Sequence, residues 1–80
     1  MSHVIYALHV ADRAQAAPKV QGILTKYGMS IKTRFGSHDP RCGAGVIVLE
    51  MMGAKEEYAG LEGELAAIGV EVKIVEFECK

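Results

Sequence analysis

Histidine and cysteine are the residues of this sequence with the most distinctive chemistry. His38 and Cys42 lie in segment 36–43, where Pro40 and flanking glycines favour a turn. Imidazole and thiolate groups bind zinc, nickel or copper, and a cysteine near a histidine can also act as a nucleophile with its base. The chain offers no second lobe to form a deep pocket, so we expect no enzyme here.

Arginines near expected turns form a second candidate site. Asp12 precedes the first helical pattern, where its carboxylate can cap the helix and free backbone N–H groups can hold a small anion. Capping is the default role for Asp12. The candidate effector-binding residues are Asp12, Arg13, Arg34 and Arg41.

Composition limits the functional classes. The 80 residues are half apolar and carry 9 basic and 10 acidic side chains, so direct nucleic-acid binding by this chain is not expected. No apolar run reaches the ~20 residues that span a bilayer, and no signal peptide opens the sequence. We therefore expect a cytoplasmic protein with one domain over residues 1–80 and two reduced cysteines.

An internal repeat with a spacing of 41 residues indicates the fold. Leu24 matches Leu65, and Gly28 matches Gly69. The other matched pairs are Tyr6 with Ile47, Leu8 with Leu49, Val10 with Met51, Ala17 with Tyr58, Val20 with Leu61, Tyr27 with Ile68, Ile31 with Val72, and Lys32 with Lys73. Each half therefore predicts a strand, a helix and a strand.

The individual elements follow from local patterns. Strands are expected at residues 3–10, 30–36, 44–51 and 70–77. Two apolar stripes at helical spacing precede Gly28 and Gly69. We expect Gly28 to end the first helix in the left-handed conformation. Pro18 conflicts with the first helix, so either the first turn is distorted or the regular helix begins near Pro18.

Two such halves predict an α+β, ferredoxin-like βαββαβ sandwich of the ACT-like type. The antiparallel sheet should have the order 4-1-3-2, with both helices on one face. Alternation along the central strands then leaves an aliphatic centre on the other face, formed by Ile5, Ala7, Val46 and Val48. A charged rim of His3, His9, Lys32, Arg34, Glu50, Glu71 and Lys73 is expected around it. Such a patch predicts that this face, or an edge strand, joins subunits into a homodimer or homotetramer, and the alternative is an exposed sheet in a monomer.

The expected topology also suggests a metal site. We expect His3, His38, Cys42 and Cys79 to meet at one end of the sheet. None of their spacings is a recognised ligand pair, so a transition metal is an alternative and no cofactor is required.

The chain resembles the iron-only hydrogenase system regulators in its glycine spacing and apolar pattern. The matching positions are 23–28, Arg34, Gly36, Gly43, Leu49, Gly53, Leu61, Leu65, Gly69 and 70–73. The resemblance covers nearly the whole chain and implies an oligomeric ACT-like module linked to hydrogenase maturation or control. Its architecture is similar to the effector domain of nickel-responsive repressors, but only Cys42 has a counterpart among their metal ligands.

These observations predict a non-enzymatic regulatory protein that senses a small effector at a subunit interface. One alternative is a metal sensor that uses His38 and Cys42. Another is an assembly domain without a ligand.

Overall fold

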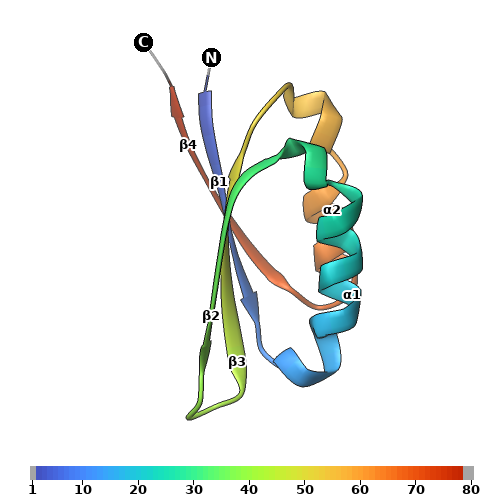
Figure 1. The fold of residues 1–80 in the computed structure, drawn as a ribbon, viewed down its shortest axis with the longest axis vertical. Coiled ribbons are helices and arrows are strands. Elements are labelled where there is room, and N and C mark those ends of the chain that lie inside the picture. The colour runs from blue at the N-terminus through green and yellow to red at the C-terminus, as the bar shows by residue number, and fades with distance from the viewer. Residues whose placement is uncertain (1, 79–80) are drawn as a thin grey trace.

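The computed structural model describes residues 2–78, which form a four-stranded antiparallel sheet and two helices (Figure 1). The elements in chain order are β1 (Ser2–Val10), α1 (Arg13–Lys26), the 3₁₀ turn η1 (Gly28–Ser30), β2 (Ile31–Asp39), β3 (Ala44–Met51), the 3₁₀ turn η2 (Lys55–Tyr58), α2 (Leu61–Ala67) and β4 (Glu71–Glu78). The strand order β2-β3-β1-β4 is the predicted order 4-1-3-2, read from the opposite edge. The ferredoxin-like βαββαβ fold is therefore confirmed.

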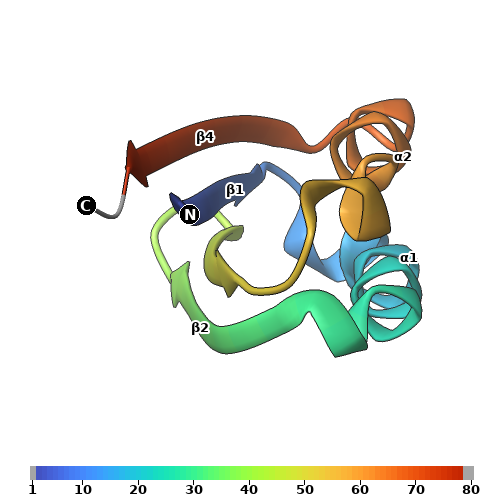
Figure 2. The same cartoon turned by 90° about the horizontal axis from the view of Figure 1, so that it is seen from above.

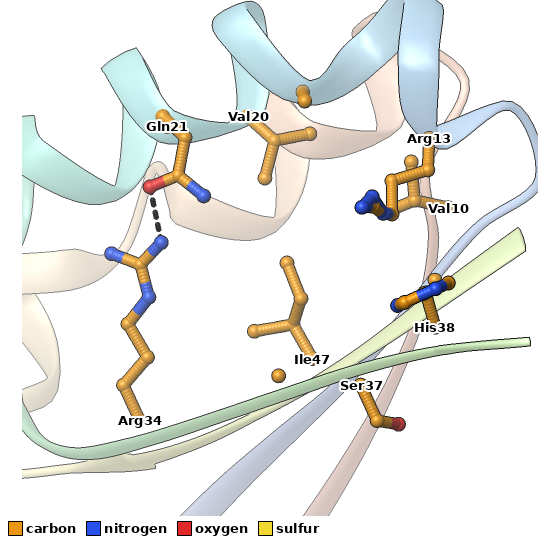
Figure 3. Close-up of a pocket in the computed structure, with 11 residues that line it drawn as sticks. Val10, Arg13, Val20, Gln21, Arg34, Ser37, His38 and Ile47 are labelled. Atoms are coloured by element: carbon orange, nitrogen blue, oxygen red, sulfur yellow. Dashed lines mark hydrogen bonds between the residues drawn. The ribbon is translucent and has the colours of Figure 1, made fainter.

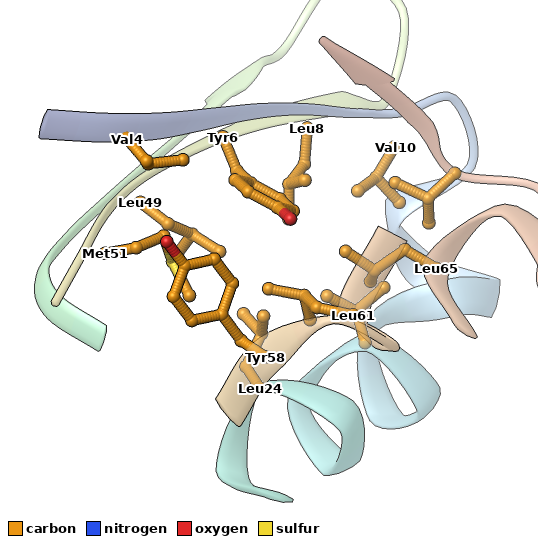
Figure 4. Packing of buried hydrophobic residues seen from close by; sticks show 12 residues of the cluster. Val4, Tyr6, Leu8, Val10, Leu24, Leu49, Met51, Tyr58, Leu61 and Leu65 are labelled. Carbon is orange, nitrogen blue, oxygen red and sulfur yellow. The ribbon is translucent and has the colours of Figure 1, made fainter. Parts of the chain in front are cut away.

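Both helices cover the same face of the sheet (Figure 2). Leu8 and Leu49 point from the central strands toward Leu24 of α1 and Leu65 of α2, and all four side chains are buried (Figure 4). Tyr6 and Tyr58 pack edge to face in this core, with ring centroids 6.1 Å apart. The core thus lies between one sheet face and the two helices, as the two apolar stripes predicted.

Helix α1 begins at Arg13 because Asp12 caps it. The Asp12 carboxylate accepts a hydrogen bond of 3.2 Å from the backbone N–H of Gln15. Pro18 lies inside the helix, so the expectation of a helix starting near Pro18 is wrong. Gly28 opens η1 without a positive φ, so its predicted left-handed conformation is also wrong. Gly69, its equivalent in the repeat, has φ of +85°.

Helix α2 is shorter than its apolar stripe suggested. Tyr58 ends η2, and the regular helix starts only at Leu61, after a cap at Gly60. The side chains of the stripe nevertheless remain on one side, with Tyr58, Leu61 and Leu65 buried. The break therefore changes the helix length but leaves its packing face intact.

Strand β2 differs most from expectation. It continues to Asp39, so Gly36, Ser37 and His38 belong to a strand and not to an irregular loop. The pairing with β3 also shifts near Lys32: Ile31 pairs with Met51, but Thr33 pairs with Glu50. This β-bulge reverses which side chains of β2 face the helices.

Among residues 2–78, no helix has both the length and the apolar character needed to cross a membrane.

Candidate functional site: a basic pocket between α1 and the sheet

A cavity of about 370 Å³ lies between α1 and strands β2 and β3 (Figure 3). The apolar part of its lining comes from the first half of α1 and from the strands below. The lining residues are Val10, Arg13, Ala17, Val20, Gln21, Arg34, Gly36, Ser37, His38, Gly45 and Ile47. We call this cavity the basic pocket, because its lining includes Arg13, Arg34 and His38 and no acidic residue.

Arg34 reaches the basic pocket because of the bulge in β2. Simple alternation from Ile31 would turn Arg34 toward the opposite face, where the sequence analysis placed it in the charged rim. That expectation is wrong: the bulge pairs Arg34 with Leu49, whose side chain is buried under the helices. Its guanidinium donates a hydrogen bond to the side-chain carbonyl of Gln21 on α1 (Figure 3).

Arg13 enters the pocket from the first residue of α1. Its backbone N–H donates a hydrogen bond of 3.2 Å to the carbonyl of Gly43, which ties the helix start to the β2–β3 turn. A Cβ atom on Gly45 would lie 3.0 Å from Cδ of Arg13. The absence of a side chain at Gly45 therefore lets the Arg13 side chain lie close against β3.

His38 lies near Arg13 at the same end of the pocket (Figure 3). It pairs with Gly45 across the β2–β3 ladder, so its side chain points toward α1. The neighbouring Ser37 pairs with Val46, whose side chain is on the opposite face, and its hydroxyl points away from the imidazole in Figure 3. Ser37 and His38 therefore do not form a nucleophile and base.

The pocket is suited to bind an anion. Guanidinium groups donate two parallel hydrogen bonds to a carboxylate or a phosphate, and Arg34 and Arg13 approach from different elements. With no acidic residue in the lining, neither arginine is neutralised within the pocket. The candidate effector residues Arg13 and Arg34 are thus brought together, and they are joined by His38 and Gln21, which the sequence analysis had not assigned to this site.

Asp12 and Arg41, the other two candidate effector residues, do not line the basic pocket. Asp12 is occupied as the helix cap. Arg41 donates hydrogen bonds of 3.0 and 2.8 Å to the Asp39 carboxylate within the β2–β3 turn. These bonds from Arg41 hold the pKa of Asp39 below its usual value. Both residues therefore stabilise the local structure next to the site.

The predicted grouping of metal ligands is wrong for His3. His38 pairs with Gly45 at the start of β3, whereas the start of β1 lies beside the ends of β3 and β4. His3 and His38 are therefore at opposite ends of the sheet, because neighbouring strands are antiparallel. Cys42 is exposed in the turn after His38, and Cys79 lies outside the described residues. Among residues 2–78, no three His, Cys, Asp or Glu residues are placed to hold a metal ion.

The sheet face away from the helices, here called the open face, contains the four candidate interface residues. Ala7 pairs with Val48 at its centre, and Ile5 and Val46 flank this pair. Three further apolar side chains of the outer strands, absent from the predicted patch, lie on this face: Phe35, Val75 and Phe77. Phe35 is 64% exposed and Phe77 57%. The pattern of alternation alone could have identified the two on β4.

A second cavity, of about 540 Å³, lies at the other end of the sheet between β1, β2 and the segment after β3. Its charges are balanced: His3 and Lys32 each lie 3.9 Å from the Glu50 carboxylate. Lys55, also in its lining, pairs with Glu76 at 2.5 Å. This cavity is larger, but the basic pocket should attract an anion more strongly, because its arginines have no acidic partner in the lining.

Comparisons with known proteins agree on the fold. No family model and no curated protein matches the chain. Among solved structures, the uncharacterized protein TM1266 from Thermotoga maritima is 26% identical, with a TM-score of 0.86 over 98% of this chain and 100% of that one.

Two more distant structures share the architecture. CPII, a nitrogen regulatory PII-like protein from Thiomonas intermedia K12, has a TM-score of 0.71 at 8% identity over 100% of this chain and 92% of its own. In that structure, CPII is bound to ADP, AMP and bicarbonate. A formyltetrahydrofolate deformylase from Pseudomonas putida KT2440 has a TM-score of 0.62 at 15% identity over 91% of this chain, which spans 28% of that protein. Residues 2–78 thus adopt the ferredoxin-like fold that is shared with ACT-like and PII-like domains.

Proposed function

We propose that this chain is a non-enzymatic regulatory domain that binds a small anionic effector in the basic pocket. The observation that carries this proposal is the pair of arginines, Arg13 and Arg34, in a lining without an acidic residue. A binding role fits better than catalysis because His38, which could serve as a general acid or base, has no nucleophile of the lining directed at it. Ser37, the hydroxyl residue of the lining, points away from His38 (Figure 3).

Similar folds offer further support for an effector role. The PII-like protein CPII is a nitrogen regulatory protein whose structure contains nucleotides and bicarbonate, all of which are anions. The deformylase match covers a minor part of an enzyme, as expected for a domain separate from its main body. The identity with these proteins is low, so the proposal depends on the pocket itself.

The pathway is proposed from sequence resemblance. Following the likeness to the iron-only hydrogenase system regulators, we place this domain in the cytoplasm, where its effector would control hydrogenase maturation or activity. Deleting the gene in the host should change iron-only hydrogenase activity under inducing conditions. Unchanged activity and unchanged enzyme maturation would contradict this part of the proposal and would leave effector binding unaffected.

We further infer that the open face binds a second copy of this chain. Its apolar centre is bordered by both signs of charge at each end. Glu50 lies near His3 and Lys32 at one end, and Glu71 lies 3.8 Å from Lys73 at the other. A face that carries both signs at each end can pair with itself without bringing like charges together, which favours a homodimer over a strongly charged partner.

A thermal-shift screen of small carboxylates, phosphates and nucleotides tests effector binding. A ligand that binds the folded state alone stabilises it by about 2.7 kcal/mol at 100 times its Kd, and the melting temperature rises accordingly. The Arg34→Gln variant should lose most of this rise. Arg41→Gln is the matched control, because it removes the same charge from the adjacent turn and should keep the rise. An equal loss in both variants, or no stabilising anion at all, would refute the proposal.

A further inference from the structure

We propose that the effector is a small dicarboxylate: two carboxylates joined by an aliphatic chain, with no ammonium group. This inference rests on the proposed function of the basic pocket and specifies its ligand class. It follows from three features of the lining, which are the separation of its cations, the apolar surface between them and the absence of acidic residues.

The basic side chains occupy two ends of the pocket. Arg34 and its partner Gln21 lie at one end, and Arg13 and His38 lie at the other (Figure 3). Arg34 and His38 are four residues apart on β2, which corresponds to about 13 Å between their Cα atoms at about 3.3 Å per residue. The Arg34 side chain extends toward Gln21 of α1, and the His38 side chain lies below Arg13 (Figure 3). A single carboxylate can engage one end, whereas a ligand with two acid groups can engage both.

The middle of the pocket is apolar. Val20 of α1 and Ile47 of β3 lie between the two ends in Figure 3, and Ala17 adds to this surface. Gly36 lies on the same side of β2 as Arg34, and a Cβ atom placed on it would meet no atom within 4 Å. The absence of a side chain at Gly36 therefore leaves room above the strand for an aliphatic chain, which gains from contact with the apolar side chains.

The charge of the lining argues against an amino acid. The ammonium group of an amino acid requires a carboxylate or several carbonyl oxygens as partners, and none of the described lining residues is acidic. It would also lie near Arg13 or Arg34, where like charges repel. A dicarboxylate of the same length avoids this repulsion and retains both acid groups.

Calorimetric titration with compounds of one chain length tests the proposal. Glutarate carries two carboxylates, pentanoate carries one, and glutamate adds an ammonium to glutarate. We expect glutarate to bind the full chain at least about tenfold more tightly than pentanoate and glutamate, which corresponds to ~1.4 kcal/mol. Inorganic phosphate should resemble pentanoate, because it can engage one end alone. Pentanoate, glutamate or phosphate binding as tightly as glutarate would overturn the proposal, as would the absence of glutarate binding.

Two arginine variants show whether both ends are used. Arg13→Gln and Arg34→Gln should each bring the affinity for glutarate to within about twofold of that for pentanoate, because one carboxylate then lacks its partner. Arg41→Gln should retain the full difference. A glutarate preference that survives in both pocket variants would contradict the two-ended arrangement.

Gly36→Val tests the location without changing any charge. Gly36 does not have a positive φ, and valine favours strands, so this variant should fold with unchanged or higher stability. Its side chain would fill the middle of the pocket, and glutarate binding should fall at least about tenfold. Unchanged glutarate binding in a folded Gly36→Val variant would place the ligand elsewhere. If other anions stabilise the protein through Arg34 while glutarate does not, the effector function stands and the dicarboxylate assignment fails.

Discussion

Glu64 joins the two helices through hydrogen bonds at their exposed side. Its carboxylate accepts two hydrogen bonds from Nζ of Lys26, at 2.9 and 3.1 Å, and one from the hydroxyl of Tyr27. The Tyr27 hydrogen bond, with a further contribution from Lys26, lowers the pKa of Glu64 below its usual value of 4.5. The same hydrogen bond raises the pKa of Tyr27, because it favours the protonated phenol.

A first prediction follows from this lowered pKa. Because the Glu64 carboxyl binds its proton more readily in the unfolded chain, its contribution to stability is present above pH 4.5 and is lost as the pH falls through the folded-state value. The wild type should therefore lose more stability below pH 4.5 than a Glu64→Gln variant, as measured by urea denaturation at a series of pH values.

Glu62→Gln is the matched control for this experiment. It removes a carboxylate from the same helix but leaves the hydrogen bonds from Lys26 and Tyr27 in place. Its acid-induced loss of stability should therefore resemble that of the wild type. Parallel pH profiles for the wild type and Glu64→Gln would contradict the prediction.

At the scale of the element, two glycines of the α2 region have different roles. Gly60 caps the helix, and a Cβ atom there would lie 2.7 Å from the hydroxyl oxygen of Tyr27. Gly63 lies inside the helix, where a Cβ atom would meet nothing within 4 Å. Gly60 thus permits close contact between the helices, whereas Gly63 has no such packing role.

We therefore expect opposite effects of two alanine substitutions. Gly63→Ala should raise the free energy of unfolding by about 1 kcal/mol, because alanine favours the helix and restricts the unfolded chain. Gly60→Ala should lower it by roughly 1 kcal/mol, because the Tyr27 side chain must move and its hydrogen bond to Glu64 is weakened. Equilibrium denaturation measures both values, and equal changes in the two variants would show that the contact with Tyr27 is unimportant.

The local sequence pattern was not sufficient to predict the backbone conformation at the ends of the two helices. Gly28 and Gly69 occupy equivalent positions in the repeat, yet only Gly69 of the two has a positive φ. In the first half, η1 continues the turn beyond Tyr27, and the backbone N–H of Met52 donates a hydrogen bond of 2.8 Å to the carbonyl of buried Ser30. This hydrogen bond joins η1 to the segment after β3, which is distant in the sequence, so the residues near Gly28 could not have predicted it.

At the scale of the whole molecule, the open face carries apolar side chains that the core does not cover, among them Phe35, Val75 and Phe77. It spans all four strands, with Val48 between Ala7 and the exposed Phe35. A second copy on this face would bury these side chains while both helices and the basic pocket remain accessible, because they lie on the other side of the sheet (Figure 2). Dimerisation and effector binding can therefore be tested separately.

Sedimentation of a Val48→Glu variant tests the dimer. A carboxylate at the centre of an apolar interface would lose its hydration without gaining a partner, so we expect the dissociation constant to rise at least about tenfold. Met29→Glu is the control, because Met29 is 88% exposed in η1, away from the open face. A wild type that sediments as a monomer at high micromolar concentration would refute the proposed interface.

The sequence by itself determined the topology of this protein. The repeat relates β1, α1 and β2 to β3, α2 and β4, and each apolar stripe needs a sheet face to cover it. Central and edge strands could be distinguished because charged residues such as Lys73 are tolerated where one side of the strand faces water. These features repeat along the chain at known periods, so they can be recognised without coordinates.

Only the tertiary structure decided the content of the basic pocket. The bulge near Lys32 reverses the direction of Arg34, and no residue type at that position announces it. The pairing of β2 with β3 up to Asp39 likewise turns His38 toward α1. A shift of one residue in strand register moves a side chain to the other face, and the register depends on contacts between distant segments. The pocket therefore emerges from strand pairing, while the fold that holds it follows from local pattern.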